Sequence, residues 1–130
     1  MIEVNNLTTS QINKQFLKKI VKKVLQGEKK KIELSIALVN QTTIKKLNKK
    51  YRNKDKPTDI LSFFYGDSAE LVICPVEVKK NALIFKNSFK KELTKTLIHG
   101  ILHLTGYDHE TTRKKAEIME KKQEYYLSQF

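Results

Sequence analysis

All three histidines of the chain lie in the eleven-residue segment HGILHLTGYDH, which runs from His99 to His109. His99 and His103 are four residues apart, so on a helix their rings project from the same face. Gly106 can adopt the left-handed conformation that ends a helix and turns the chain back. The segment therefore predicts a helix that carries two imidazoles and ends at Gly106, followed by a turn that brings His109 towards them.

Three converging imidazoles are typical of a zinc site, in which each ligand nitrogen lies about 2.0–2.1 Å from the ion. Three protein ligands leave one coordination position open, as in a catalytic rather than a structural zinc site. We therefore expect one Zn²⁺ per chain, held by His99, His103 and His109, although three imidazoles also suit nickel or copper. The alternative is that these histidines are ordinary helix and loop residues.

The residue after the first histidine is Gly100. In HExxHxxGxxH metalloproteases, whose ligand spacing this segment shares, a glutamate at that position is the general base for peptide cleavage. Its absence argues against peptide hydrolysis by that route, and we expect Gly100 to leave space beside the metal for a bulky substrate group. If all three imidazoles bind metal, none remains to act as acid or base, which also disfavours a histidine-pair ribonuclease mechanism.

The charge of the chain favours a nucleic-acid partner. Twenty-six Lys and Arg residues against fourteen Asp and Glu residues give a net charge of +12, which is typical of nucleic-acid binders. The excess is almost entirely lysine, which a compositional habit could also produce, and the arginines are Arg52 and Arg113. A planar guanidinium can hold a phosphate through two parallel hydrogen bonds. We expect Arg52, at the start of the loop RNKDKPTD, to bind phosphate, with Lys54 and Lys56 on the same positive rim.

Acidic and hydroxyl side chains near these groups are candidates for orienting roles. Asp108 precedes the third predicted ligand, so it could hold an imidazole in place or pass a proton. Thr58 or Asp59 could cap or orient the loop that begins at Arg52. The predicted catalytic residues are Arg52, Asp108 and His109, and His109 is also a predicted metal ligand.

The rest of the chain alternates helical and strand patterns. We expect helices over residues 10–26 (capped by Thr9 or Ser10), about 44–51, 75–85, 88–106 and about 112–130, and strands over residues 32–39, 60–65 and 70–74. On the last helix, Ala116, Met119, Gln123 and Tyr126 share one face. These elements predict an α/β (α+β) fold in which one small mixed sheet packs against about five helices, as a single domain over residues 1–130.

The sequence gives no sign of export or of membrane insertion. Its one cysteine, Cys74, cannot form an intramolecular disulfide, which fits a reducing compartment. No run of 18 apolar residues is present, and the N-terminus lacks the basic and apolar regions of a secretory signal. We expect a cytoplasmic protein without a membrane partner.

Two blocks of the sequence resemble the YbeY-type endoribonucleases that mature ribosomal RNA. HGILHLTGYDH is similar to the family signature H-G-x-L-H-L-x-G-Y-D-H at every fixed position. LNKKYRNKDKPTDILSF, from Leu47 to Phe63, resembles the second block, Y-R-x-x-D-x-P-T-D-V-L-S-F, with Ile60 in place of the usual Val. The chain departs from the family at Ala69, where Gly is usual, and at Asn87, where His is frequent.

The resemblance implies a single α/β domain with zinc on His99, His103 and His109, and places Arg52 on the functional arginine of the family. It also implies cleavage of single-stranded RNA, a role at the 3′ end of small-subunit ribosomal RNA and in ribosome quality control, and hence precursor RNA and the ribosome as partners.

Two other functions remain open at this point. One is a zincin-type metallohydrolase that acts on peptides or small molecules, against which Gly100 and the positive charge argue. The other is a non-enzymatic ribosome-associated factor whose zinc is structural. A structural zinc would need a fourth protein ligand, and we expect Cys74 to pack in the core instead.

Overall fold

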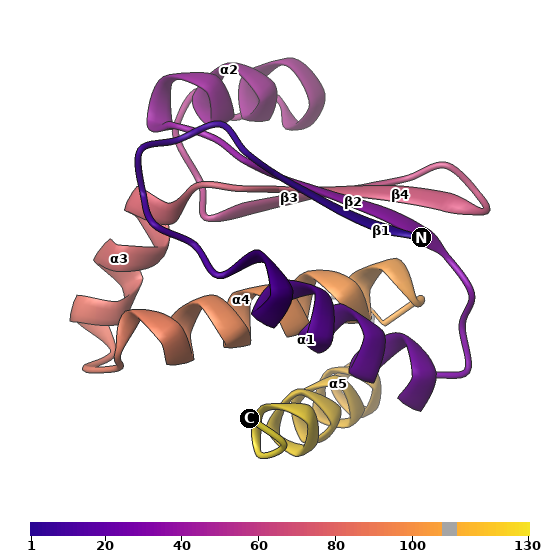
Figure 1. Cartoon of the computed structure of the whole chain (residues 1–130). Coiled ribbons are helices and arrows are strands. Elements are labelled where there is room, and N and C mark those ends of the chain that lie inside the picture. Colours follow the sequence, from indigo (N-terminus) through magenta and orange to yellow (C-terminus); the bar gives the residue numbers. More distant parts are fainter. Residues whose placement is uncertain (108–111) are drawn as a thin grey trace.

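The computed structural model describes residues 1–107 and 112–130, and this part of the chain forms one four-stranded sheet and five helices (Figure 1). The elements in chain order are β1 (Ile2–Asn6), α1 (Lys14–Gly27), β2 (Glu33–Leu38), α2 (Gln41–Arg52), β3 (Ile60–Phe64), β4 (Ser68–Ile73), α3 (Pro75–Ile84), α4 (Phe89–Leu104) and α5 (Arg113–Leu127). The predicted α/β class with one mixed sheet is confirmed.

The sheet has the strand order β1-β2-β4-β3. β1, β2 and β4 run parallel to one another, and β3 runs antiparallel to β4. Figure 1 shows α2 on one face of the sheet and α1, α4 and α5 on the other. β2 alternates between buried and less buried residues, whereas the C-terminal half of β4, from Leu71 to Ile73, is buried on both faces because helices cover both sides of the sheet.

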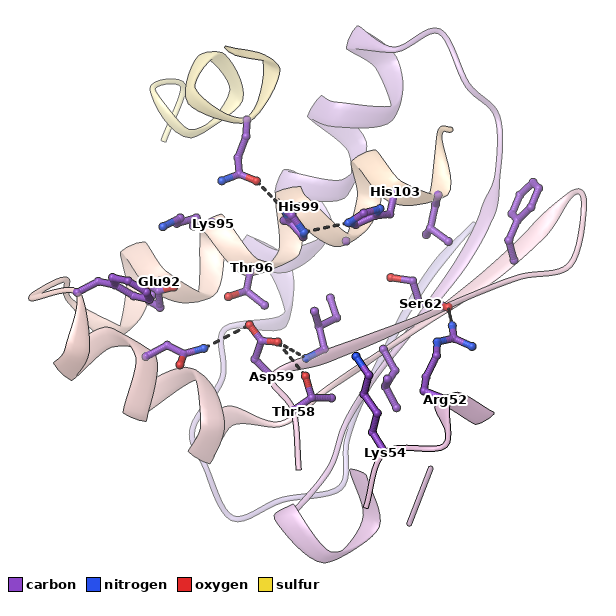
Figure 2. A pocket seen from close by; sticks show the side chains of 18 of the residues that line it. Arg52, Lys54, Thr58, Asp59, Ser62, Glu92, Lys95, Thr96, His99 and His103 are labelled. Atoms are coloured by element: carbon purple, nitrogen blue, oxygen red, sulfur yellow. Dashed lines mark hydrogen bonds between the residues drawn. The ribbon is translucent and has the colours of Figure 1, made fainter. Parts of the chain in front are cut away.

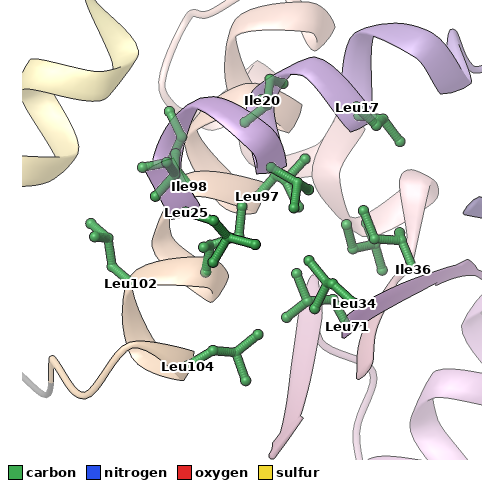
Figure 3. Close-up of a cluster of buried hydrophobic side chains, with 14 of the residues drawn as sticks. Leu17, Ile20, Leu25, Leu34, Ile36, Leu71, Leu97, Ile98, Leu102 and Leu104 are labelled. Carbon is green, nitrogen blue, oxygen red and sulfur yellow. The ribbon is translucent and has the colours of Figure 1, made fainter. Parts of the chain in front are cut away.

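Successive residues of the strands point into two separate apolar cores. The larger core joins the sheet to α1 and α4, and Figure 3 shows part of it, including Leu17, Ile36, Leu71 and Leu97. The smaller core lies against α2 and consists of Val39, Ile44, Leu61, Val72 and Cys74. Because Leu61 of β3 points into the smaller core, its neighbours Ile60 and Ser62 point to the α4 face, where the candidate site lies.

The sequence patterns do not predict β1, which forms the edge of the sheet. The strand IEVNN has two apolar residues, Ile2 and Val4, among polar ones. It is ordered by parallel pairing with β2, in which Val4 lies opposite Ile36. A pattern this short carries little strand signal, so tertiary pairing decides its conformation.

The first helix begins later than predicted. Its N-cap is Asn13, whose side chain accepts a hydrogen bond from the Phe16 amide at 3.0 Å, and not Thr9 or Ser10. Asn6 accounts for the difference, because its side-chain amide donates to the Ser10 carbonyl at 2.8 Å and its oxygen accepts from the Thr8 hydroxyl at 2.6 Å. These bonds stabilise a turn where the apolar pattern predicts helix.

The last two helices begin where predicted, but α4 ends at Leu104 rather than Gly106, and α5 ends at Leu127 rather than at the C-terminus. Ser88 caps α4 by accepting from the Lys91 amide at 3.1 Å, and Thr112 caps α5 through the Lys115 amide at 3.1 Å. Gly106 follows α4 with a φ of +106°, the left-handed conformation expected after a helix. Among the described residues, no helix combines the length and the apolar character needed to cross a membrane.

Candidate active site

An open cleft of about 850 Å³ lies between α4 and β3, and the loop that joins α2 to β3 forms one of its sides (Figure 2). Its lining includes residues of α3 and one residue of α5, Gln123. The cleft brings together groups that are far apart in the sequence, including Arg52, His99 and His103.

The two described histidines meet at the wall of this cleft. The Nε2 atoms of His99 and His103 are 2.9 Å apart, and their ring centroids are 4.6 Å apart. Their i and i+4 positions on α4 produce this convergence, as the spacing predicts. His99 is half-buried, whereas His103 is exposed to the cleft.

Gln123 of α5 contacts and orients the ring of His99. Its side-chain Oε1 lies 2.8 Å from Nδ1 of His99. An amide oxygen accepts hydrogen bonds, so this contact pairs it with Nδ1 and leaves Nε2 facing Nε2 of His103. The sequence pattern groups Gln123 with Ala116, Met119 and Tyr126 on one face of the last helix, and no role was predicted for it. The available signal was a polar side chain on an otherwise apolar face, which requires a partner.

A buried polar cluster holds α5, and therefore Gln123, against α1. The carboxylate of Glu28, whose side chain is 4 % exposed, accepts hydrogen bonds from Lys122 at 3.0 and 3.2 Å and from the hydroxyl of Tyr126. Burial alone would raise the pKa of Glu28, but hydrogen bonds from Tyr126, Lys122 and Tyr107 outweigh it and lower this pKa. The hydrogen bond to Glu28 in turn raises the pKa of Lys122.

Arg52 lies at the rim of the cleft, at the C-terminal end of α2. Its Nη2 donates to the Ser62 carbonyl at 2.7 Å, its Nη1 donates to the Tyr51 carbonyl at 3.4 Å, and its guanidinium lies 5.2 Å from the ring centre of Phe63. These contacts orient the exposed side chain along β3. Because a guanidinium has five N–H donors, several remain to bind an anion in the cleft.

The lysines around the cleft differ in part from the prediction. Lys54 lines the cleft, as expected, but Lys56 does not. Lys95 lines it as well and was not predicted. It lies on α4 four residues before His99, so the helical spacing that pairs the histidines could have found it.

Asp59 organises the start of β3. Its Oδ1 accepts from the Ile60 amide at 2.8 Å and from the Thr58 hydroxyl at 3.3 Å, and its Oδ2 accepts from Asn81 of α3 at 3.3 Å. The expectation that Thr58 or Asp59 orients this loop therefore agrees with the contacts, which join β3 to α3 at one end of the cleft.

Glu92 of α4 is a buried acidic residue that also lines the cleft. Its Oε1 accepts a hydrogen bond from Asn87 at 3.0 Å, so one of the two departures from the family pattern supplies its partner. The other departure, Ala69, is buried in β4 opposite Leu34 of β2. Neither residue disturbs the histidine pair.

The expectation that Gly100 leaves space for a substrate group is wrong. A Cβ atom at this position would lie 2.5 Å from Cδ1 of Ile60, 3.3 Å from Cδ2 of Leu71 and 3.5 Å from Oγ of Ser62. The missing side chain instead allows α4 to pack closely against β3 and β4. Gly100 thus sets how near the histidines lie to the strand that contacts Arg52.

Asp108 and His109 lie outside the described residues, and their predicted roles stay predictions. Within residues 1–107 and 112–130, no three His, Cys, Asp or Glu side chains are grouped so as to hold a metal ion. The donor pair of His99 and His103 nevertheless fits a shared ion, because two nitrogens each about 2.0–2.1 Å from one ion lie at most about 4.2 Å apart. Their 2.9 Å separation is within that limit.

Cys74 is not part of the cleft. It is fully buried in the smaller core, on the α2 face of the sheet, and burial raises the pKa of its thiol. This position agrees with the expectation that Cys74 packs in the core, and it argues against this residue as a fourth ligand beside His99.

The fold and the cleft define a small α/β protein whose paired histidines line the same cleft as an arginine and two lysines. Residues 3–130 match the family model for Endoribonuclease YbeY. The chain therefore belongs to the YbeY endoribonuclease family, as the resemblance of its two sequence blocks indicates, and this membership supports an endoribonuclease role.

Individual relatives agree with this assignment. The chain is 41% identical over 119 residues to Endoribonuclease YbeY of Thermotoga petrophila. The aligned region covers 89% of this chain and 77% of that relative. It is 41% identical over 132 residues to the protein of the same name from Petrotoga mobilis, covering 97% and 92%. The solution structure of TM1509 from Thermotoga maritima matches with a TM-score of 0.72 and 37% identity, covering 98% of this chain and 87% of that one.

Proposed function

We propose that this protein is a zinc-dependent endoribonuclease that cleaves single-stranded RNA. The observation that carries the proposal is the pair of imidazoles whose Nε2 atoms converge to 2.9 Å in a cation-lined cleft, on a chain that belongs to the YbeY endoribonuclease family. From the resemblance to this family we also propose that its substrate is precursor ribosomal RNA, at the 3′ end of the small-subunit RNA. The proposed role is in ribosome quality control, with the ribosome as partner, in the cytoplasm.

Zinc is the proposed cofactor, with His99 and His103 as ligands together with His109, the third ligand of the sequence prediction. A bound zinc ion would supply Lewis-acid polarisation of a phosphoryl oxygen and would lower the pKa of water. The contact of Nδ1 of His99 with Gln123 favours this role, because it orients the ring and leaves Nε2 facing His103 at the wall of the cleft.

The side chains around the histidines provide positive charge where phosphodiester cleavage develops negative charge. Arg52 is proposed to bind the non-bridging phosphate oxygens with the N–H groups that the Ser62 and Tyr51 carbonyls do not occupy. Lys54 and Lys95 raise the local concentration of the polyanion. Asp108 remains the proposed residue for orienting an imidazole or moving a proton.

The remaining alternatives have less support. A zincin-type hydrolase of peptides or small molecules would need a general base where this chain has Gly100, a position packed against Ile60 and Leu71. A factor with a closed structural zinc would need a fourth ligand, and Cys74 is buried on the other face of the sheet.

A cleavage assay with matched arginine variants tests the proposal. We expect Arg52→Ala to lower kcat/KM on single-stranded RNA by at least about 10²-fold, the scale of losing one transition-state donor. Arg113→Ala is the control, because this exposed side chain forms an ion pair with Glu117 on α5 and does not line the cleft.

Elemental analysis of the purified protein and cleavage before and after chelation test the metal. We expect about one zinc per chain, loss of cleavage with a chelator, recovery with zinc, and loss in His99→Ala without unfolding. Full RNA cleavage by metal-stripped His99→Ala would refute zinc dependence. Digestion of an unstructured protein without RNA cleavage would favour the metallohydrolase.

A further inference from the structure

Two exposed phenylalanines line the cleft beside its charged groups. Phe64 ends β3 and is 55 % exposed, and Phe85 directly follows α3 and is 57 % exposed. Both belong to the cleft lining, which otherwise includes many polar and charged side chains. Two large apolar rings presented to solvent in a polar cleft are a feature that packing of the fold does not explain.

The two rings lie at opposite ends of the cleft. Phe85 lies at the α3 end, where the bond from Asn81 to Asp59 joins α3 to the start of β3. Phe64 is the last residue of β3, four residues beyond Ile60, which corresponds to about 13 Å along the strand.

The catalytic candidates lie between these two ends. Lys95, His99 and His103 follow one another at four-residue spacing along one face of α4, as Figure 2 shows, and together they span about 12 Å of the helix. The ammonium group of Lys95 lies 5.0 Å from the ring centre of Phe85. The row of cationic and imidazole groups on α4 therefore has an aromatic ring beside its Lys95 end.

We infer that Phe85 and Phe64 are base-stacking subsites that hold two unpaired nucleobases of a single-stranded RNA, one on each side of the histidine pair. This inference rests on the proposed function and specifies how its substrate is held. Proteins that bind single strands combine a positive groove for the backbone with aromatic rings on which bases stack. Lys95 serves both parts, because it lies over the Phe85 ring and can meet a phosphate beside it.

The same arrangement explains a preference for single strands. In a duplex the base faces are already stacked on one another, so they cannot stack on isolated rings at the two ends of the cleft. An RNA segment bound in this way is anchored on both sides of the bond to be cut, which fixes the phosphate beside Arg52 and His99. The stacking is tolerant of sequence, because every base has a π-face.

Fluorescence of 2-aminopurine tests the inference. Short single-stranded RNAs carrying this base at successive positions are mixed with the full-length protein, and quenching is recorded by stopped flow before cleavage. We expect strong quenching at two positions flanking the cleavage site. Phe85→Leu should remove it at one position and Phe64→Leu at the other, each weakening the Kd by about 5- to 150-fold, whereas Phe→Tyr at either position should retain it.

Matched controls come from neighbouring exposed residues outside the cleft. Tyr65→Leu removes an aromatic ring next to Phe64, and Leu83→Ala removes an apolar side chain on α3; both residues are exposed and neither lines the cleft. We expect both variants to bind and cleave as the unmodified protein does.

The outcomes separate the inference from the proposed function. If the unmodified protein cleaves single-stranded RNA but Phe64→Leu and Phe85→Leu keep normal quenching and Kd, the inference is overturned and the nuclease proposal stands. If the unmodified protein neither binds nor cleaves RNA, the proposed function fails. Equal binding of duplex RNA, or competition by an apolar peptide but not by RNA, would also overturn the inference.

Discussion

Replacing Gln123 with leucine tests whether α5 controls the imidazole of His99. The substitution keeps the size of the side chain and removes the oxygen that lies 2.8 Å from Nδ1 of His99. Without that acceptor, neither the tautomer nor the orientation of the ring is fixed from the α5 side. We therefore expect Gln123→Leu to bind zinc more weakly while the fold is retained.

The size of the expected loss in zinc affinity follows from the position of the hydrogen bond between Gln123 and His99. Loss of a hydrogen-bond partner of a metal-binding histidine typically costs about 10- to 100-fold in metal affinity, which is about 1.4–2.7 kcal/mol. The effect on the free energy of unfolding of the metal-free protein should be smaller, at most about 1.5 kcal/mol, because Gln123 is half-buried and contributes one neutral hydrogen bond.

Competition with a chromophoric chelator measures zinc affinity, and urea unfolding of the metal-free protein measures stability. Gln123→Glu keeps an acceptor oxygen and should bind zinc at least as tightly as the unmodified chain. Gln129→Leu is the control, because this exposed amide donates to Ser128 Oγ at 3.3 Å, beyond the end of α5. Unchanged zinc affinity in Gln123→Leu, or an equal loss in Gln129→Leu, would refute the reasoning.

Three further predictions concern stability. Gly100→Ala should lower the free energy of unfolding by up to about 2 kcal/mol, because crowding of the Ile60 side chain costs about 1–3 kcal/mol and the higher helix propensity of alanine offsets about 1 kcal/mol; urea unfolding should show partial recovery in Gly100→Ala/Ile60→Val, and no recovery would contradict the packing argument. Folding lowers the pKa of Glu28, so its interactions stabilise the protein at pH values above its ordinary pKa of 4.5, and this stabilisation is lost as the pH falls through the folded pKa. Thermal melts at decreasing pH should therefore show a steeper loss of stability in the unmodified chain than in Glu28→Gln. Parallel curves for the two proteins would count against this reasoning. Asn13→Ala should cost about 1 kcal/mol by removing the cap of α1, with Ser10→Ala as a near-neutral control in urea unfolding.

The sequence predicted most of the fold because its signals are local. Helical periodicity and capping residues such as Ser88 and Thr112 lie within the elements they specify, so α4 and α5 begin where expected. β1 gave no such signal, because the pairing of Val4 with Ile36 joins positions 32 residues apart. The start of α1 was misplaced because Asn6 and Thr8 form a turn that competes with the apolar pattern.

The candidate site was predictable where one element carries it and unpredictable where several elements meet. His99 and His103 converge because they share a helix face, and this geometry is visible in their spacing. Gln123 reaches His99 across 24 residues, and the packing of Gly100 against Ile60 depends on how a helix meets a strand. Contacts of this kind depend on tertiary structure, which no local pattern encodes.

The dependence of His99 on α5 has a consequence for synthesis of the protein. During translation, both imidazoles of α4 are added to the chain before Gln123, and Gln123 is held in place once Lys122 and Tyr126 have bound Glu28, which lies near the other end of the chain. The histidine pair therefore acquires its final order late, when the last helix docks. A nascent chain that has not reached this helix carries the histidine pair without the hydrogen bond that orients His99.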